Sequence, residues 1–454
     1  MRGGRTLVDP AATMATHFDN SHADPTAPSL MPWRGGTQPS LMPWRGIALV
    51  ACAALLGACG SDDLAAEGSA DDAYAESAGY AGSDTTAGDP SGTTCQGDDC
   101  IETVPAGQLT AGEWDDLENW WFWTDLMAPT AVDVESWAWV EDHWGLFTRD
   151  HAAVQVHIGG APVVDAEVRL VGDDQSVRWT SRTDAAGRAE VFGGLFGEAP
   201  MDWSLEVECD AGHVTRLDTV TLGEEAPIEV ELDVATDPAE VLDLAFVVDT
   251  TGSMGDELQY LQAELRSVVD AVRAEHDGVT VRVGIVVYRD EGDEYVTRSS
   301  DLSSDLDVAQ RFLAAQYATG GGDFPEAVDA ALHAAMHELT WSDSARARLL
   351  VLALDAPPHH RPDALARMRA ATETASATGV RIIGLSGSGI DKPTEFLVRS
   401  LGIATGGTYT FLTDHSGIGD AHLEQKPTIG GFQVELLNAL LTRLVSEALE
   451  GTER

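Results

Sequence analysis

The feature that most constrains the fold is a largely apolar run at residues 242–248, which stops abruptly at Asp249. A strand without a polar face is buried on both sides, as in a parallel sheet that helices cover. Similar runs occupy residues 281–288, 349–354 and 380–385. Helical spacing of apolar residues marks 327–339, 363–377, 432–449 and the set Leu258, Leu261, Leu265, Val268 and Val272. The alternation predicts a doubly wound α/β domain over residues 238–450.

Polar residues follow the predicted strands where they end. The first strand runs into Asp249-Thr-Thr-Gly-Ser-Met254, a later loop reads Thr319-Gly-Gly-Gly-Asp-Phe-Pro-Glu326, and the fourth strand ends at Asp355. In a doubly wound sheet these carboxyl ends border one crevice. Ligands that are all oxygen suit a hard cation such as Mg²⁺. The sequence therefore predicts a divalent-metal site.

The pattern Asp-x-Thr-x-Ser, supplied by Asp249, Thr251 and Ser253, resembles the metal-ion-dependent adhesion site of von Willebrand factor A domains. The resemblance implies Mg²⁺ (or Mn²⁺ or Ca²⁺) as cofactor, a protein as partner, and Asp355 as a further ligand. Many relatives take another ligand from a Thr in the second loop. Here Asp323 occupies that place, with Thr319 as the alternative. Three carboxylates would make the metal less attractive to an acidic partner.

The two histidines of the last loop, His359 and His360, are expected to be ordinary loop residues, because the predicted site is otherwise all oxygen.

Residues 152–236 predict a small antiparallel β-sandwich. Apolar residues alternate at Val154, Val156 and Ile158 and again in later segments, with Gly- and Asp-rich turns between them. Residues 160–170 and 183–189 resemble the carboxypeptidase-regulatory-like sandwich of bacterial surface proteins. That resemblance implies a spacer or binding module without catalytic residues. Cys209 shares the phase of two apolar neighbours and is expected to be a buried thiol.

The N-terminal region predicts export. An apolar run at residues 47–56 is too short to cross a bilayer and is typical of a signal peptide, assigned to residues 1–58. A start at Met31 or Met42 would give a signal peptide of ordinary length. The sequence Leu56-Gly-Ala-Cys59 resembles a bacterial lipobox, which implies acylation of Cys59 and a membrane-anchored lipoprotein on the periplasmic or surface side of the cell envelope. Cleavage by the ordinary signal peptidase is the alternative.

Residues 59–106 are rich in Gly, Ala, Ser, Thr and acidic residues and predict a disordered acidic tether. Cys95 and Cys100 within it are candidates for a small disulfide loop. A Trp-rich segment, residues 107–151, follows, with seven Trp between Trp114 and Trp144. Such a cluster can bind carbohydrate or pack on the next domain. Packing is favoured, because so many exposed Trp side chains are costly.

The formal net charge of −48 argues against nucleic acid as a partner. No nucleophile elbow, metalloprotease helix or acid–base pair is recognisable, so no enzyme activity is expected. The sequence thus predicts a lipid-anchored exported protein that binds a protein partner through its metal site. The alternative is a structural envelope lipoprotein whose metal only stabilises loops.

Overall fold

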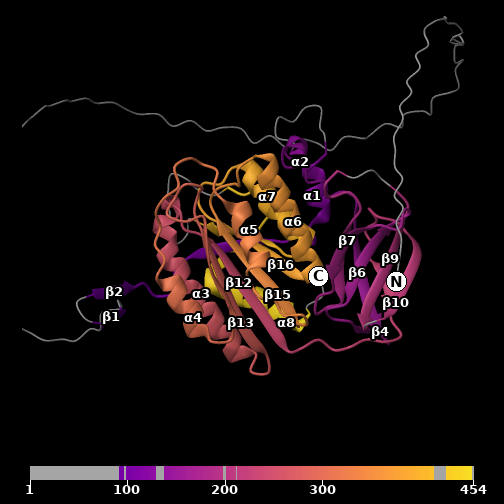
Figure 1. Ribbon diagram of the computed structural model, residues 1–454, viewed down its shortest axis with the longest axis horizontal. Coiled ribbons are helices and arrows are strands. Elements are labelled where there is room, and N and C mark those ends of the chain that lie inside the picture. The colour runs from indigo at the N-terminus through magenta and orange to yellow at the C-terminus, as the bar shows by residue number, and fades with distance from the viewer. Residues whose placement is uncertain are drawn as a thin grey trace, which may run out of the picture. The chain divides into compact units, whose positions relative to one another are not determined.

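The structure is a computed structural model (Figure 1) that describes residues 92–96, 99–128, 137–197, 201–210, 212–413 and 426–451. All of them belong to the second of two compact units, Thr85–Arg454. The signal-peptide region, Cys59 and most of the tether lie outside the described residues. Within the described part of the chain, no helix has the length and apolar character needed to cross a membrane.

The C-terminal domain is built on an eight-stranded sheet of order β14-β13-β12-β15-β16-β17-β3-β18. Its central strands β13, β12, β15, β16 and β17 are parallel, whereas β14, β3 and β18 run antiparallel to their neighbours. The strands are β12 (Val241–Asp249), β13 (Thr280–Tyr288), β14 (Thr297–Ser303), β15 (Ala347–Leu354), β16 (Val380–Ser386), β17 (Tyr409–Thr413), β3 (Thr110–Trp114) and β18 (Glu435–Leu436).

Helices cover both faces of this sheet, because each central strand sends alternate apolar side chains to opposite sides. One core contains Leu244 and Phe246 of β12 with side chains of α3, α4 and α8. The other contains Ala245 and Val247 with side chains of α5, α6 and α7. The prediction of an α/β sheet flanked by helices is confirmed. The helices are α3 (Gly255–Glu275), α4 (Leu306–Ala314), α5 (Val328–His337), α6 (Pro362–Thr378), α7 (Lys392–Thr405) and α8 (Leu437–Glu450).

The Trp-rich segment belongs to the same domain, which the sequence did not predict. Strand β3 pairs with β17, and the short helices α1 (Trp120–Leu126) and α2 (Ala138–Trp144) follow it. Trp123 is 1% exposed and stacks on Phe396 of α7, with ring centroids 5.4 Å apart. Trp137 and Trp144 are also buried, whereas Trp121 and Trp139 are exposed. Most of the cluster is therefore buried, as the packing interpretation expected, but it packs within the C-terminal domain and not on the next domain in sequence.

A buried arginine fixes this segment in place. The guanidinium of Arg399 on α7 contacts Asp116 at 2.6 Å and Glu395 at 3.0 Å, and all three side chains are buried. It also lies over the rings of Trp123 and Trp137, at 5.0 and 5.3 Å from their centroids. A buried arginine left without its carboxylates would be strongly unfavourable. A domain that began at residue 238 would lack both β3 and Asp116.

Strands β4–β11 form two further sheets, of order β10-β9-β6-β7 and β11-β4-β5, with β8 paired to β4. Buried side chains of both sheets belong to one core. All pairs are antiparallel except β11 with β4, which are parallel. The strands are β4 (His151–Ile158), β5 (Ala161–Pro162), β6 (Glu167–Gly172), β7 (Val177–Arg182), β8 (Arg188–Phe192), β9 (Trp203–Asp210), β10 (His213–Val220) and β11 (Ile228–Glu231).

The structure describes the surroundings of Cys209 and of the pair Cys95 and Cys100, for which the sequence made predictions. Cys209 is a free thiol that is only partly buried, and its Sγ contacts the backbone of Thr236, 3.4 Å from the nitrogen and 3.6 Å from the oxygen. Strands β1 (Gly92–Gln96) and β2 (Asp99–Thr103) form a hairpin whose register places Cys95 opposite Cys100. The Cys95–Cys100 disulfide stays a prediction.

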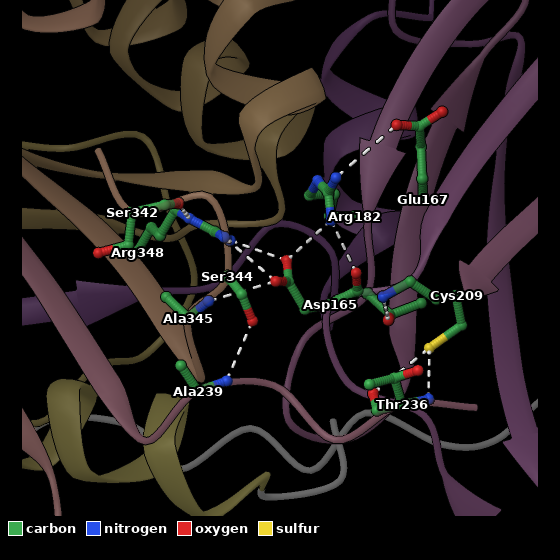
Figure 2. A network of polar contacts seen from close by, with 12 residues as sticks. Asp165, Glu167, Arg182, Cys209, Thr236, Ala239, Ser342, Ser344, Ala345 and Arg348 are labelled. Atoms are coloured by element: carbon green, nitrogen blue, oxygen red, sulfur yellow. Dashed lines mark hydrogen bonds and ion pairs between the residues drawn. The ribbon is translucent and has the colours of Figure 1, made fainter. Parts of the chain in front are cut away.

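Asp165, in the loop between β5 and β6, joins the two sheets to the C-terminal domain (Figure 2). Its carboxylate accepts two hydrogen bonds from Arg348 of β15, at 2.8 and 3.1 Å, and one from the backbone nitrogen of Ala345 at 3.3 Å. Arg182 of β7 contacts the same carboxylate at 3.2 Å. Asp165 holds this position with a φ of 61°, which is uncommon for a residue other than glycine.

Candidate metal site

The first loop of the site is ordered by the carboxylate of Asp249, the last residue of β12. Its Oδ1 accepts hydrogen bonds from the backbone nitrogen of Thr251 at 2.8 Å and from its hydroxyl at 2.7 Å. The Thr251 and Ser253 hydroxyls are 3.1 Å apart. A single turn of 3₁₀-helix, Gly252–Met254, then leads into α3. The three residues that the sequence singled out in this loop therefore lie together.

Asp355 follows β15, which pairs in parallel with β12, so the two strand-end carboxylates face the same crevice. Oδ2 of Asp249 and Oδ1 of Asp355 are buried, and neither has a hydrogen-bond partner within the described residues. Burial, with the charge of Asp355 adding to it, raises the pKa of Asp249 to about 7. Burial also raises the pKa of Asp355. Two buried carboxylates side by side thus resist ionisation together.

The second loop presents a different residue from the one predicted. Thr319 and Asp323 are both exposed, whereas Glu326 is 3% exposed. The backbone nitrogen of Glu326 donates to the Pro357 carbonyl at 2.8 Å, which ties the second loop to the loop after β15. Its Oε2 is buried with no partner in the described part of the chain. Of the acidic residues in this loop, Glu326 is the one turned inward.

Contacts around the loop glycines show where the Glu326 carboxylate points. A Cβ added to Gly321 would lie 2.7 Å from Glu326 Oε1 and 3.4 Å from Thr251 Cβ, so the carboxylate is directed toward the Thr251 loop. Burial, and then the charges of Asp249, Asp290 and Asp355, raise the pKa of Glu326 to about 9. Glu326 is thus an acidic group of the same crevice. Sequence reasoning missed it because an acidic residue just before a helix is an ordinary helix-start signal.

Further polar groups surround the crevice. The buried hydroxyl of Tyr288, on β13, has a pKa raised well above its usual range by burial and by the charge of Asp249. Glu257 of α3 is buried and accepts a hydrogen bond from the Ser388 hydroxyl at 2.8 Å.

The two histidines of the last loop make other contacts. His359 Nε2 lies 2.7 Å from an oxygen of Asp290, and His360 Nε2 lies 2.6 Å from the carbonyl oxygen of His143. The expectation that these histidines are ordinary loop residues stays a prediction.

The groups of this crevice fit a hard dication. The hydroxyls of Thr251 and Ser253 and the buried carboxylate oxygens of Asp249 and Asp355 are all oxygen ligands. No three His, Cys, Asp or Glu side chains within the described residues are gathered closely enough to hold a metal by themselves. Hydroxyl and carboxylate oxygens suit a hard cation that accepts such ligands and retains waters, as Mg²⁺ does.

Comparison with known families assigns this part of the chain. Residues 243–365 match the family model of the von Willebrand factor A domain. The chain therefore contains a von Willebrand A-type domain there, and that part of the resemblance is confirmed. The carboxypeptidase-regulatory-like resemblance has no such support and stays a prediction.

Two curated proteins show sequence similarity. The chain is 36% identical over 128 residues to an ariadne-like RING finger protein of Acanthamoeba polyphaga mimivirus, covering 28% of this chain and 12% of that protein. It is 26% identical over 175 residues to the alpha-protein kinase vwkA of Dictyostelium discoideum, covering 36% of this chain and 26% of the kinase. The chain thus spans well under two thirds of either relative.

Among solved structures, similarity is found to an aerotolerance-related membrane protein of Bacteroides fragilis, with 17% identity, a TM-score of 0.29, and coverage of 46% of this chain and 98% of that one. BatB of Bacteroides thetaiotaomicron is 14% identical with a TM-score of 0.32, and the match covers 46% of this chain and 98% of BatB. The pilus adhesin SpaC of Lactobacillus rhamnosus GG is 12% identical with a TM-score of 0.33, and the match covers 55% of this chain and 32% of SpaC.

Proposed function

We propose that this protein is a lipid-anchored, exported binding protein that holds a protein partner through a divalent cation, Mg²⁺ foremost, in its A-type domain. A von Willebrand A-type domain fits a protein-interaction role. We infer binding without catalysis, since the sequence lacks the recognisable motifs of an enzyme.

One observation carries the proposal: Asp249 and Asp355 each have a buried oxygen without a hydrogen-bond partner among the described residues, beside the Thr251 and Ser253 hydroxyls. Buried carboxylates without a compensating positive charge are unfavourable. A cation among them would remove that penalty.

The chain's own residues would have distinct roles at such a site. Thr251 and Ser253 would hold the cation through their hydroxyls, and Asp249 and Asp355 would balance its charge. Asp249 also orders the loop through its two hydrogen bonds with Thr251. A bound divalent cation supplies an open position for an oxygen of the partner. Glu326, buried in the same crevice, would further reduce the net positive charge that the partner meets.

We assign the anchor to Cys59, on the lipobox resemblance of Leu56-Gly-Ala-Cys59. A chain that carries two or more acyl groups stays at a membrane, because each buried methylene contributes about 0.8 kcal/mol. Metabolic labelling with a fatty-acid probe should mark the wild type and Cys52→Ser but not Cys59→Ser. Label that persists on Cys59→Ser would remove the anchor from the proposal.

The binding role is tested by capture of envelope proteins on the immobilised chain in Mg²⁺, with and without chelator. Capture should require the metal and be lost in Asp249→Ala, whereas Asp343→Ala, which alters an exposed acidic residue elsewhere in the domain, should behave as wild type. If Mg²⁺ raises the melting temperature but the same proteins are retained in chelator, the metal only stabilises loops. The scaffold role would then replace the binding role.

A further inference from the structure

The eight-stranded sheet ends in a segment that lies along β3. A Cβ on Gly430 would touch the ring of Trp114, at 2.6 Å, and the Phe432 ring lies 4.9 Å from that of Phe411. Farther on, Glu435 and Leu436 of β18 pair with Ala111 and Thr110. Residues 430–436 thus run antiparallel to β3. Since β18 is the last strand of the sheet, no described strand pairs with its outer side.

This edge is apolar, which is unusual for the border of a sheet. Phe432 is 41% exposed, Val434 40% and Leu436 45%. The opposite border of the same sheet, β14, instead exposes Arg298, Ser299 and Asp301. Charged side chains at an edge strand discourage pairing with other chains, and apolar side chains on an open edge permit it. The β18 border carries one charged side chain, that of Glu435, which is paired with Arg443, whereas β14 exposes two charged side chains, Arg298 and Asp301.

An acidic cavity of about 750 Å³ adjoins the apolar edge and shares Phe432 and Gln433 with it. Six carboxylates line the cavity, those of Glu113, Asp115, Glu118, Asp184, Glu435 and Glu447. Among the described residues that line it, Arg381 and Arg443 carry the opposite charge, so the formal charges of this described lining sum to minus four (six acidic, two basic). Arg443 already pairs with Glu113, Glu435 and Glu447, at 2.9, 2.9 and 3.3 Å. The cavity suits a further positive group.

We propose that the β18 edge is a docking site for an extended segment of another protein that carries alternating apolar residues and at least one Lys or Arg. The segment adds a strand to β18 through main-chain hydrogen bonds, the mode known as β-augmentation. Its apolar side chains cover Phe432, Val434 and Leu436, and its basic side chain enters the acidic cavity. A second copy of this chain is a poor occupant, because each copy carries a formal net charge of −48. This site is separate from the metal crevice.

The test uses a synthetic probe, acetyl-Thr-Val-Lys-Val-Lys-Val-Thr-amide, and the full chain with Cys59 replaced by Ser. Calorimetry should show saturable binding that weakens with salt and is unchanged by chelator, which separates this site from the metal site. A matched peptide with Glu for Lys should bind at least about tenfold more weakly, because like charges meet in the cavity. A peptide N-methylated at alternate residues should not bind, because it cannot pair along the strand.

Variants of the chain locate the site. Val434→Ser should weaken the Lys peptide about fivefold to tenfold through lost apolar burial. Val308→Ser on α4, where the side chain is 39% exposed, is the matched control and should leave binding unchanged. Equal effects of the two substitutions, equal binding of the Glu peptide, or binding of the N-methylated peptide would each overturn the proposal. It would also be overturned if the wild type dimerises in sedimentation and Val434→Ser does not, since the occupant would then be a second copy.

Discussion

The substitution Asp249→Asn isolates the electrostatic cost of burying the Asp249 carboxylate without a cation. Asn keeps the Oδ1 that accepts the two hydrogen bonds from Thr251 but removes the charge. Burial and the charge of Asp355 raise the pKa of Asp249 from 3.8 to about 7. The neutral form is thus favoured in the folded state, so the cost is absent well below pH 4, grows as the pH rises, and is complete above about pH 7.

The size of the effect follows from that shift. A shift of about three pH units, at about 1.4 kcal/mol each, gives an upper limit of about 4 kcal/mol. Because Asp249 and Asp355 titrate as a pair, the limit belongs to the pair. Without metal, Asp249→Asn should therefore match the wild type in unfolding free energy near pH 4 and exceed it by about 2–4 kcal/mol near pH 8. Mg²⁺ should reverse the order near pH 8, because it binds the charged site of the wild type.

Urea unfolding, followed by tryptophan fluorescence at several pH values in chelator and in Mg²⁺, measures both differences. Asp343→Asn is the control for a carboxylate that is exposed. If Asp249→Asn is less stable than the wild type near pH 8 in chelator, the carboxylate is compensated by something other than a cation. The electrostatic argument for the metal site would then fail.

Three further changes test other parts of the structure. Glu326→Gln should weaken Mg²⁺ or Mn²⁺ binding about tenfold in calorimetry, and Asp323→Asn should leave it unchanged, because Glu326 is buried in the crevice and Asp323 is exposed. The opposite result would restore Asp323 as the metal ligand of this loop. Residues 238–454 alone should lack a cooperative thermal transition, and residues 104–454 should show one, because the shorter chain lacks β3 and Asp116. A cooperative transition in the shorter chain would contradict this prediction. Asp165→Asn should lower the unfolding free energy by about 3 kcal/mol in urea, because it leaves the buried Arg348 without its carboxylate, and an unchanged value would show that this contact adds nothing.

The parts that sequence could predict are those governed by local pattern. Apolar runs located the central strands, and residues at strand ends located Asp249, Thr251 and Asp355, because both follow from the geometry of a parallel sheet. Helix α8 illustrates the limit of that approach. It begins at Leu437. The preceding residues 432–436, whose apolar positions fit a helical pattern from sequence, instead approach β3, and the last two of them, Glu435 and Leu436, form β18.

Two features could not be predicted from the sequence, because they depend on contacts or backbone paths that no local pattern records. The sequence of Thr110–Trp114 is Thr-Ala-Gly-Glu-Trp, which lacks the alternation of apolar and polar residues that marks a strand. The segment forms strand β3 by pairing with β17. The choice between Asp323 and Glu326 depends on the path of the loop. Gly320 and Gly321 have φ values of 84° and 71°, which glycine adopts readily, and their turn exposes Asp323 while Glu326 faces inward. No residue pattern reveals that path.

The position of β3 in the sheet also sets the order in which the chain can fold. The Thr110 and Thr413 hydroxyls, 2.8 Å apart, belong to residues separated by 303 positions. At ribosomal rates of about 5–20 residues per second, β3 emerges roughly 15–60 seconds before the strand it pairs with. Strands β4–β11 can pair during that interval, because their partners lie close in sequence. The C-terminal domain, by contrast, can close only once its last strands have been made, so a nascent chain carries its buried tryptophans uncovered until synthesis is nearly complete.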